Sequence, residues 1–250
     1  MSTCDVILAV WNGQNYLPAM LDSLLSQTAG DFNVLVRDDG STDGSLEILA
    51  SYKPRFDGRF RVIAGEPTGS ATANFAILMR ETKADYVLFA DQDDVWKPEK
   101  VELTLRSLKE AEAKYGKSTP IYFATDIAVV NKDLELISPS YWKWKRLKPS
   151  MMGKLSQSLI CVPIQGMASG INRALLARSG ESGRREGHQP RLVDAAHRSG
   201  DGQSHLRSHR DRTVSSPRRK CLHPKGGWPC SVFKTRIGHQ LPASWARKAD

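Results

Sequence analysis

Cysteine pairs, long apolar runs and a basic leader are all missing from this sequence of 250 residues. Its four cysteines, Cys4, Cys161, Cys221 and Cys230, are scattered without CxxC spacing, which argues against a zinc site and against a disulfide framework. No apolar run approaches the roughly 18 to 20 residues that a membrane-spanning helix needs. The N-terminus has no basic region before its first apolar stretch, so a secretory signal is not expected. These absences predict a cytoplasmic protein with free thiols.

Positive charge is not in excess in the first 177 residues, whereas it dominates the rest of the chain. Residues 1–177 hold 20 Lys and Arg against 21 Asp and Glu, and residues 178–250 hold 16 against 6, together with all six histidines. The second segment is poor in Leu, Ile, Val and Phe and has no helical or strand period, which predicts a disordered basic tail. We therefore expect a globular domain at residues 3–177 and a separate tail at residues 178–250.

The first segment alternates apolar runs with stretches of helical periodicity. This alternation predicts an α/β fold with an open, mostly parallel sheet and helices on both of its faces. In such a sheet, ligands bind at the carboxyl ends of the strands, where the strand order reverses. The predicted strands are 4–10, a run from 33 to the acids at 38 and 39, 60–65, 85–91 and 120–131; the predicted helices are 15–28, 45–52, 72–84 and 97–116, the last with Pro98 in its first turn.

Two clusters of acids follow predicted strands, at residues 38–43 (DDGSTD) and 91–94 (DQDD). Both clusters are expected at the same edge of the sheet. Asp91 and Asp93 can both reach one cation, and carboxylate oxygens suit Mg²⁺ or Mn²⁺. The alternative for each cluster is a solvated turn in which an acid caps the next helix.

Five stretches carry a resemblance to a known family, in the order in which that family has them: VILAVWNGQNYLPAMLDSLLSQT, VRDDGSTDGS, GSATANFAILM, ADYVLFADQDDVWKPEKVE and QGMASGINRALL. Over roughly residues 3–177 the chain resembles the family 2 glycosyltransferases, which are inverting enzymes with the Rossmann-like GT-A fold. The DQDDVW variant is similar to the subgroup that makes bacterial surface polysaccharides and is often described as rhamnosyltransferase-like.

The resemblance implies a nucleotide-diphosphate sugar, UDP- or dTDP-linked, as the donor. It implies that Ala9, Val10 and Trp11 lie beside the nucleotide base, and that Asp38 accepts a hydrogen bond from the base imide. Asp39 belongs to the same implied nucleotide site. The implied acceptor is a glycan or a lipid-linked molecule.

The second acidic cluster is implied to be the metal side of the site. Asp91 faces the ribose or the metal, and Asp93 is the direct ligand of Mg²⁺ or Mn²⁺. Asp94 either belongs to this metal side or only caps the following helix. Trp96 and Pro98 are expected to be structural.

Three features depart from the family pattern. Ala73 precedes Asn74 where many members have Arg. Residues 141–150 (YWKWKRLKPS) are aromatic and basic, so they either contact a lipid-diphosphate acceptor at a membrane surface, as in a peripheral protein at the inner face of the plasma membrane, or form a solvated loop. The third departure is that the family's general base, an Asp in an ED- or HDWW-like motif, and its later YRxHGxN element are both absent after INRALL.

A change of reading frame would explain that absence. Codons that encode residues 190–197, read one base later, can encode HDWWMLLI, and those for residues 214–221 can encode YRHHGENV in the same frame. We therefore hypothesise a frame change near residues 176–182, which makes the basic tail out-of-frame translation and not a nucleic-acid-binding segment. A true tail that recruits RNA or anionic lipid is the alternative.

The sequence thus predicts a metal-dependent inverting glycosyltransferase of surface polysaccharide synthesis, with no nucleic acid among its partners. Because the general base is absent from this reading frame, activity of the chain is expected to be impaired. The alternative is a catalytically inactive nucleotide-sugar-binding protein or pseudogene product.

Overall fold

The structure is a computed structural model that describes residues 3–131, 133–147, 166–186, 207–215, 233–234 and 236–237 of the 250 residues. Within this part of the chain, side-chain surroundings are described as far as residue 179. The predicted general-base and YRxHGxN segments at 190–197 and 214–221 lie mostly outside the described residues. So do Lys148 to Ser150, which end the aromatic and basic segment.

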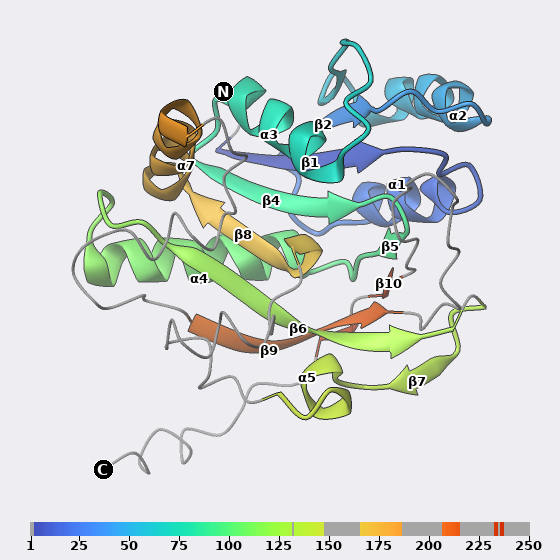
Figure 1. The fold of residues 1–250 in the computed structure, drawn as a ribbon. Helices are drawn as coiled ribbons and strands as arrows, with labels where there is room; N and C mark the ends of the chain where they lie inside the picture. Colours follow the sequence, from blue (N-terminus) through green and yellow to red (C-terminus); the bar gives the residue numbers. More distant parts are fainter. Residues whose placement is uncertain are drawn as a thin grey trace.

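One mixed sheet organises the molecule, with the strand order β11-β9-β10-β6-β8-β4-β1-β2-β3 (Figure 1). Strands β1, β2, β3 and β4 run parallel, and β8 is antiparallel to both β4 and β6. Since the chain builds β2 and β3 on one side of β1 and places β4 on the other, the strand order reverses at β1. The strands are β1 (Cys4–Val10), β2 (Asn33–Asp38), β3 (Phe60–Val62), β4 (Tyr86–Asp91), β5 (Asp94–Val95), β6 (Tyr122–Val130), β7 (Leu136–Ser138), β8 (Ser169–Asn172), β9 (Arg207–Ser215), β10 (Phe233–Lys234) and β11 (Arg236–Ile237).

Helices cover both faces of this sheet, which confirms the predicted architecture (Figure 1). Side chains of α1, α2 and α4 pack in one apolar cluster, and those of α3 and α7 pack in another. The helices are α1 (Leu17–Leu25), α2 (Ser45–Tyr52), α3 (Ala71–Glu81), α4 (Lys100–Tyr115), α5 (Tyr141–Trp144) and α7 (Arg173–Glu186), with 3-10 turns at η1 (Lys53–Phe56) and η3 (Gly166–Ala168).

The burial of strand β1 explains why its sequence is apolar from Val6 to Val10. Successive side chains of a strand point to opposite faces of the sheet. Accordingly, Val6, Leu8 and Val10 pack with α1 and α4, whereas Ile7 and Ala9 pack with α3 and α7. A strand buried on both faces favours apolar residues along its length, and the one acid of β1, Asp5, is hydrogen-bonded to Asn33 and Thr82.

Two local expectations are wrong. Helix α4 begins at Lys100 with Glu99 as its N-cap residue, so Pro98 precedes the helix instead of lying in its first turn. The strand expected at 60–65 ends at Val62, and the glycine that follows soon after, Gly65, has φ +155°. Strand β8, which lies within the fifth matching stretch, was not expected.

Only part of the segment after residue 178 lies within the described residues. Helix α7 continues to Glu186, and β9 pairs parallel to β6 along most of its length. Pairing of this kind uses backbone groups, which any sequence supplies, and the long strand β6 offers an edge for it. Within the described residues, no helix is both long and apolar enough to cross a membrane.

Candidate functional site

The two acidic clusters meet at the carboxyl ends of three neighbouring strands. Val10 of β1 is in register with Asp38 of β2, and Ala9 of β1 is in register with Asp91 of β4. Asp38 and Asp91 therefore flank the end of β1, where the strand order reverses. This is the position at which open α/β sheets bind ligands, and it confirms that both clusters lie at one edge.

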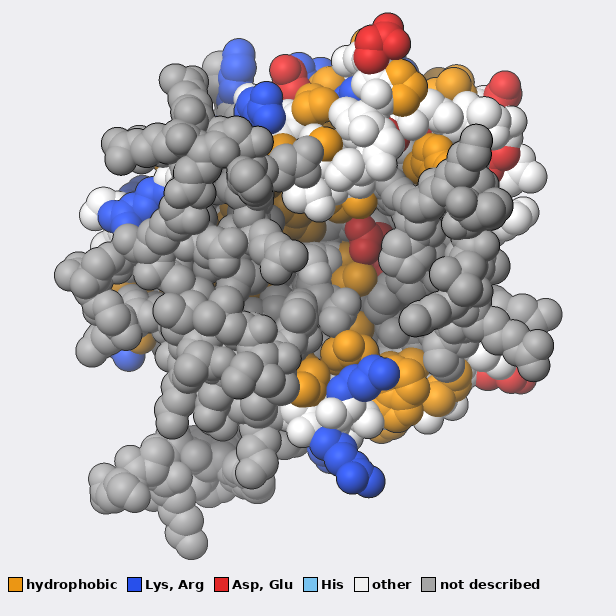
Figure 2. Space-filling view, viewed as in Figure 1, with side chains coloured by type: hydrophobic (Ala, Val, Ile, Leu, Met, Phe, Trp, Pro, Cys, Tyr) orange, Lys and Arg blue, Asp and Glu red, His pale blue; other side chains and the backbone are white. Residues whose placement is uncertain are grey.

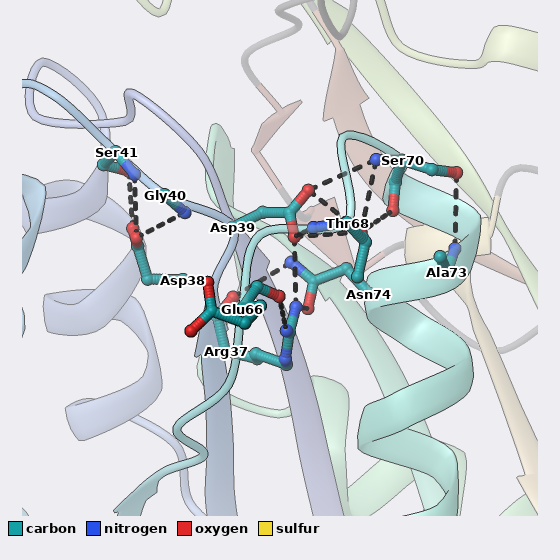
Figure 3. Close-up of polar contacts among 10 residues, drawn as sticks. All are labelled: Arg37, Asp38, Asp39, Gly40, Ser41, Glu66, Thr68, Ser70, Ala73 and Asn74. Atoms are coloured by element: carbon teal, nitrogen blue, oxygen red, sulfur yellow. Dashed lines mark hydrogen bonds and ion pairs between the residues drawn. The ribbon is translucent and has the colours of Figure 1, made fainter.

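Asp38 shapes the turn that follows β2. Its Oδ1 accepts hydrogen bonds from the backbone N–H groups of Gly40 and Ser41, at 2.9 and 2.8 Å (Figure 3). Its Oδ2 accepts one from the Ser41 hydroxyl at 2.5 Å. A carboxylate has room for about four hydrogen bonds, so this half-buried group can still accept another donor.

Asp39 points the other way and belongs to a buried network (Figure 3). It is 3% exposed and forms an ion pair with Arg37 at 3.0 Å. Its carboxylate also accepts hydrogen bonds from the backbone N–H and hydroxyl of Thr68 and from the backbone N–H of Ser70. Burial alone would raise the pKa of Asp39, but the bonds from Thr68 and Arg37 outweigh it and lower that pKa. These contacts tie the end of β2 to the loop before α3.

Arg37 joins the same network to helix α3. Its side chain is 1% exposed, and Nη1 donates to Asn74 Oδ1 at 3.1 Å while Nη2 donates to the Glu66 carbonyl at 2.5 Å. Asn74 returns a bond from Nδ2 to the Arg37 carbonyl. Ala73, the position that departs from the family pattern, donates its backbone N–H to the N-cap Ser70. The buried guanidinium of Arg37 thus supports the predicted nucleotide edge, and the sequence pattern alone did not identify it.

Gln92 links the end of β4 to the end of β1. Its Oε1 accepts from the Trp11 backbone N–H at 2.7 Å, and its Nε2 donates to the Trp11 carbonyl at 2.8 Å. The close approach leaves no room at the neighbouring glycine, because a Cβ on Gly13 would lie 2.5 Å from Gln92 Oε1. Ala9 and Val10 are buried and Trp11 is half-buried, so Trp11 is the most accessible member of the predicted base-side trio.

The loops after β1 and β2 are also bonded to each other. Asn12, at φ +47°, accepts from the Thr42 backbone N–H and donates its own N–H to Ser41. The Gly13 N–H donates to the Ser45 hydroxyl at 2.8 Å. The turn formed by Asp38 and Ser41 is therefore held against the end of β1.

The second acidic cluster has one half-buried and two fully buried carboxyl groups. Burial raises the pKa of Asp91, the half-buried one, to about 6. Asp93 and Asp94 are 4% and 0% exposed. Burial, followed by the negative charges of Asp91 and Asp93, raises the pKa of Asp94 well above its ordinary value, against the opposing charge of Lys100.

Asp94 does not cap the following helix, so that expectation is wrong. It lies in the short strand β5, whereas α4 begins at Lys100 with no side-chain cap. Trp96 is 2% exposed and packs in the core, as expected of a structural residue. Lys100, which the sequence reasoning passed over, is 1% exposed, and its Nζ lies 5.0 Å from the centroid of the Trp96 ring.

The carboxylates at this edge suit a divalent cation that is coordinated partly by the protein and partly by a bound phosphate. Mg²⁺ is usually held through one or two carboxylates together with substrate phosphates. Asp91 and Asp93 supply two carboxylates, and their charges act together on Asp94. Among the residues that the structure describes, no three His, Cys, Asp or Glu side chains converge to hold a metal on their own. The residues present thus fit a shared cation and not a closed protein cage.

Buried bonding partners were the part of the site that the sequence did not reveal. Arg37 had a usable signal, because a charged residue inside the apolar run of β2, two positions before an acid, indicates a buried ion pair. No role was predicted for Gln92, which lies between two acids, although a side-chain amide can bond both an N–H and a C=O.

Comparison with known proteins shows which family this chain is similar to. The family model described as glycosyl transferase family 2 matches residues 5–177. TuaG of Bacillus subtilis, named as a teichuronic acid biosynthesis glycosyltransferase, is 33% identical over 113 residues, which are 45% of this chain and 44% of TuaG. RfbG of Shigella flexneri, named as a dTDP-rhamnosyl transferase, is 29% identical over 98 residues, which are 38% of this chain and 34% of RfbG. The chain therefore matches less than half of the length of these relatives.

A solved structure shows the same fold. The mannosyltransferase PcManGT of Pyrobaculum calidifontis, determined with GDP-Man and Mn²⁺, superposes with a TM-score of 0.56 at 18% identity, over 87% of this chain and 58% of that one. This likeness supports the predicted GT-A-like architecture. With the family model matched over most of the chain, this protein belongs to glycosyl transferase family 2.

Proposed function

We propose that this chain descends from an inverting glycosyltransferase that moves a sugar from a UDP- or dTDP-linked donor to a glycan or lipid-linked acceptor in surface polysaccharide synthesis. The observation that carries the proposal is the placement of Asp38 and Asp91 on either side of β1, at the point where the strand order reverses. The family membership and the names of TuaG and RfbG support the class of reaction.

The base of the nucleotide lies between Trp11 and Asp38 in this proposal. Gln92 bonds both backbone groups of Trp11 and so fixes its position. The half-buried side chain of Trp11 remains accessible to the base. Asp38 keeps acceptor capacity for an imide N–H. Asp39 has both oxygens engaged in the Arg37 network, so its role is to hold the end of β2 in place.

Asp91 and Asp93 form the diphosphate side of the proposed site. They would hold Mg²⁺ or Mn²⁺, and the bound cation would supply positive charge to the nucleoside diphosphate leaving group. Asp94 is buried next to them in the chain, and burial and their negative charges raise its pKa, whereas the positive charge of Lys100 opposes that rise. Of the three carboxylates, Asp91 is the most accessible to solvent, and in this proposal the donor approaches from that side.

The acceptor hydroxyl must lose its proton, and the family's general base for that step is absent from this reading frame. We therefore expect donor binding without efficient turnover. The absence of the motif also favours the second candidate, a nucleotide-sugar-binding protein without catalytic activity.

Calorimetry with UDP and with dTDP, each with and without Mn²⁺, tests the proposal. Binding that requires Mn²⁺ and is lost in Asp38→Ala supports the assigned site. Asp85→Ala is the matched control, because Asp85 is an exposed acid just before β4, at the opposite end of that strand from Asp91. No binding by a folded chain, or binding that Asp38→Ala leaves unchanged, overturns it. A donor-turnover assay then separates the two candidates.

A further inference from the structure

Exposed apolar side chains are concentrated in one short stretch of the described chain. Five large hydrophobic residues are exposed among the residues whose surroundings are described, and three of them fall within one stretch of nine residues: Leu136 at 50%, Ile137 at 45% and Trp144 at 40%. They belong to β7 and α5, which are consecutive in the chain. Grouped exposure of this kind marks an interaction site more often than scattered exposure does.

The same stretch carries exposed positive charge. Lys143, Lys145 and Arg146 are all exposed, and Lys145 Nζ lies 4.2 Å from the centroid of the Trp144 ring. Figure 2 shows Lys and Arg side chains beside hydrophobic ones in the lower part of the molecule, where Figure 1 places α5 and β7. The acids nearby, Asp133 and Glu135, belong to the turn before β7, so the α5 end is the positive one.

A buried anchor holds this surface in shape. Asp126 of β6 is 3% exposed and accepts hydrogen bonds from the Ser140 hydroxyl at 2.5 Å and from the Trp142 backbone N–H at 3.1 Å. Trp142 itself is 5% exposed, so α5 is fixed to β6 by one indole while the other, Trp144, faces outward. A surface whose side chains are ordered in advance loses less entropy on binding.

This surface starts at the same edge of the sheet as the candidate site. Strands β4 and β6 are both antiparallel to β8, so their carboxyl ends lie at one edge. β7 pairs with that end of β6, through Val129 with Ser138 and Val130 with Leu136. The sheet edge that carries Asp91 therefore lies near any partner that binds β7 and α5.

We propose that the surface formed by residues 136–146 of β7 and α5 docks on an anionic phospholipid bilayer. Tryptophan prefers the boundary between membrane and water, and lysine and arginine beside it are attracted by anionic headgroups. The aliphatic pair Leu136 and Ile137 adds apolar area that can enter the interface. A second copy of the chain fits less well, because a two-fold contact brings the α5 lysines and arginine of both copies together. The proposal does not depend on the nucleotide-sugar site.

Co-sedimentation of the full chain with vesicles tests this inference. Vesicles of phosphatidylcholine mixed with phosphatidylglycerol should bind the protein, and binding should weaken with salt and with the removal of phosphatidylglycerol. In the double variant Lys143→Gln/Lys145→Gln, affinity should fall about 25-fold, from roughly five-fold for each charge near the surface. Trp144→Ala and, separately, Leu136→Ser/Ile137→Ser should also weaken binding.

Matched controls use residues of similar exposure elsewhere. Lys83→Gln/Lys117→Gln removes two exposed charges, and Leu46→Ser removes an apolar side chain that is 49% exposed. Neither should change vesicle binding. Equal losses in these controls, equal binding to neutral vesicles, or a dimer in light scattering that Trp144→Ala dissociates would each overturn the proposal. UDP binding with Mn²⁺, measured on the same variants, should stay unchanged, so failure of the membrane surface is distinguishable from failure of the nucleotide site.

Discussion

Gln92 bonds both backbone groups of Trp11, and through this pair the acidic loop after β4 is joined to the end of β1. The two residues are 81 positions apart in the chain. A side-chain amide that satisfies an N–H and a C=O at once fixes both the distance and the orientation of the two strand ends. The loop that carries Asp91 and Asp93 is thus positioned by the residue between them.

Replacing Gly13 with alanine should break this link. The added Cβ lies 2.5 Å from Gln92 Oε1, and Gln92 can move only by giving up its bonds to Trp11. We expect Gly13→Ala and Gln92→Ala each to lower the free energy of unfolding by about 1 to 3 kcal/mol. The double variant should be close to Gln92→Ala alone, because the clash is then absent. Urea denaturation measures all three.

Gly30→Ala is the control for this cycle, since nothing lies within 4 Å of the position that its Cβ would occupy. Its effect should stay within about 0.5 kcal/mol, as for surface substitutions generally. Additive losses for Gly13→Ala and Gln92→Ala would contradict the direct contact.

Asp39→Asn should be strongly destabilising. It removes the only charge that is paired in the described network with the buried guanidinium of Arg37, at 3.0 Å. Breaking a buried ion pair on one side costs about 3 to 5 kcal/mol, because the remaining charge is left uncompensated. Asp22→Asn provides the comparison: its pair with Arg55 is also 3.0 Å long, but both side chains are more than half exposed. That variant should lose at most about 1 kcal/mol in urea unfolding. Similar losses in the two variants would show that Asp39 is not held as described.

Protonation of the Asp39 carboxylate should lower the free energy of unfolding in acid. The pKa of Asp39 is lowered in the folded chain, so between that pKa and the unfolded value of about 3.9 the unfolded state binds more protons. The stabilisation is therefore complete above the unfolded pKa and is lost as the pH falls through the folded one. The difference in unfolding free energy between the parent chain and Asp39→Asn should be constant from about pH 7 to pH 5 and shrink below about pH 4. A difference that grows in acid would be the wrong sign.

Much of the fold could be predicted because β1, β2 and β4 carry unusually clear patterns. Each is an apolar run that ends on acids or glycine, and strands buried on both faces leave such a pattern whatever their neighbours are. The meeting of Asp38 and Asp91 followed from parallel topology alone, since parallel strands place their carboxyl ends at one edge. Pairing of β8 between β4 and β6 could not be predicted, because SGIN is too short to show a period.

Side-chain partners were the harder part of the site. Arg37 carried a local signal, the acid two positions after it. Gln92 and Lys100 carried none, because their burial depends on a contact 81 positions away and on a neighbouring ring, respectively. No local pattern separates such a residue from a solvated one. Asp39 was grouped with Asp38 for the same reason, although the alternation of a strand end already places neighbouring side chains on opposite sides.

Asp93→Asn should reduce the dependence of nucleotide binding on Mn²⁺. Asp93 is 4% exposed and lies two residues beyond the strand end that carries Asp91. Loss of a direct ligand should cost at least the roughly 10- to 100-fold in metal affinity that loss of a supporting group costs. Calorimetry with UDP at several Mn²⁺ concentrations, and again with EDTA, measures this. EDTA should bring the parent chain to the level of the variant. Asp85→Asn, an exposed acid just before β4, should bind as the parent does. Undiminished Mn²⁺ dependence in Asp93→Asn would remove Asp93 from the metal site.

Restoring the second reading frame should restore turnover. A coding sequence shifted by one base near codon 180 replaces the basic segment with one that contains HDWW, whose aspartate is encoded across Arg191 and Leu192. If that aspartate is the general base, release of nucleoside diphosphate from UDP- or dTDP-linked sugars should rise by roughly 10²- to 10⁴-fold over the present chain. The matched control is the same restored chain with that aspartate codon changed to asparagine, which should bind UDP with Mn²⁺ equally well and stay slow. Equal rates in the restored chain and its control would show that the base lies elsewhere. Equal rates in the restored and present chains would remove the frame change as the cause of low activity.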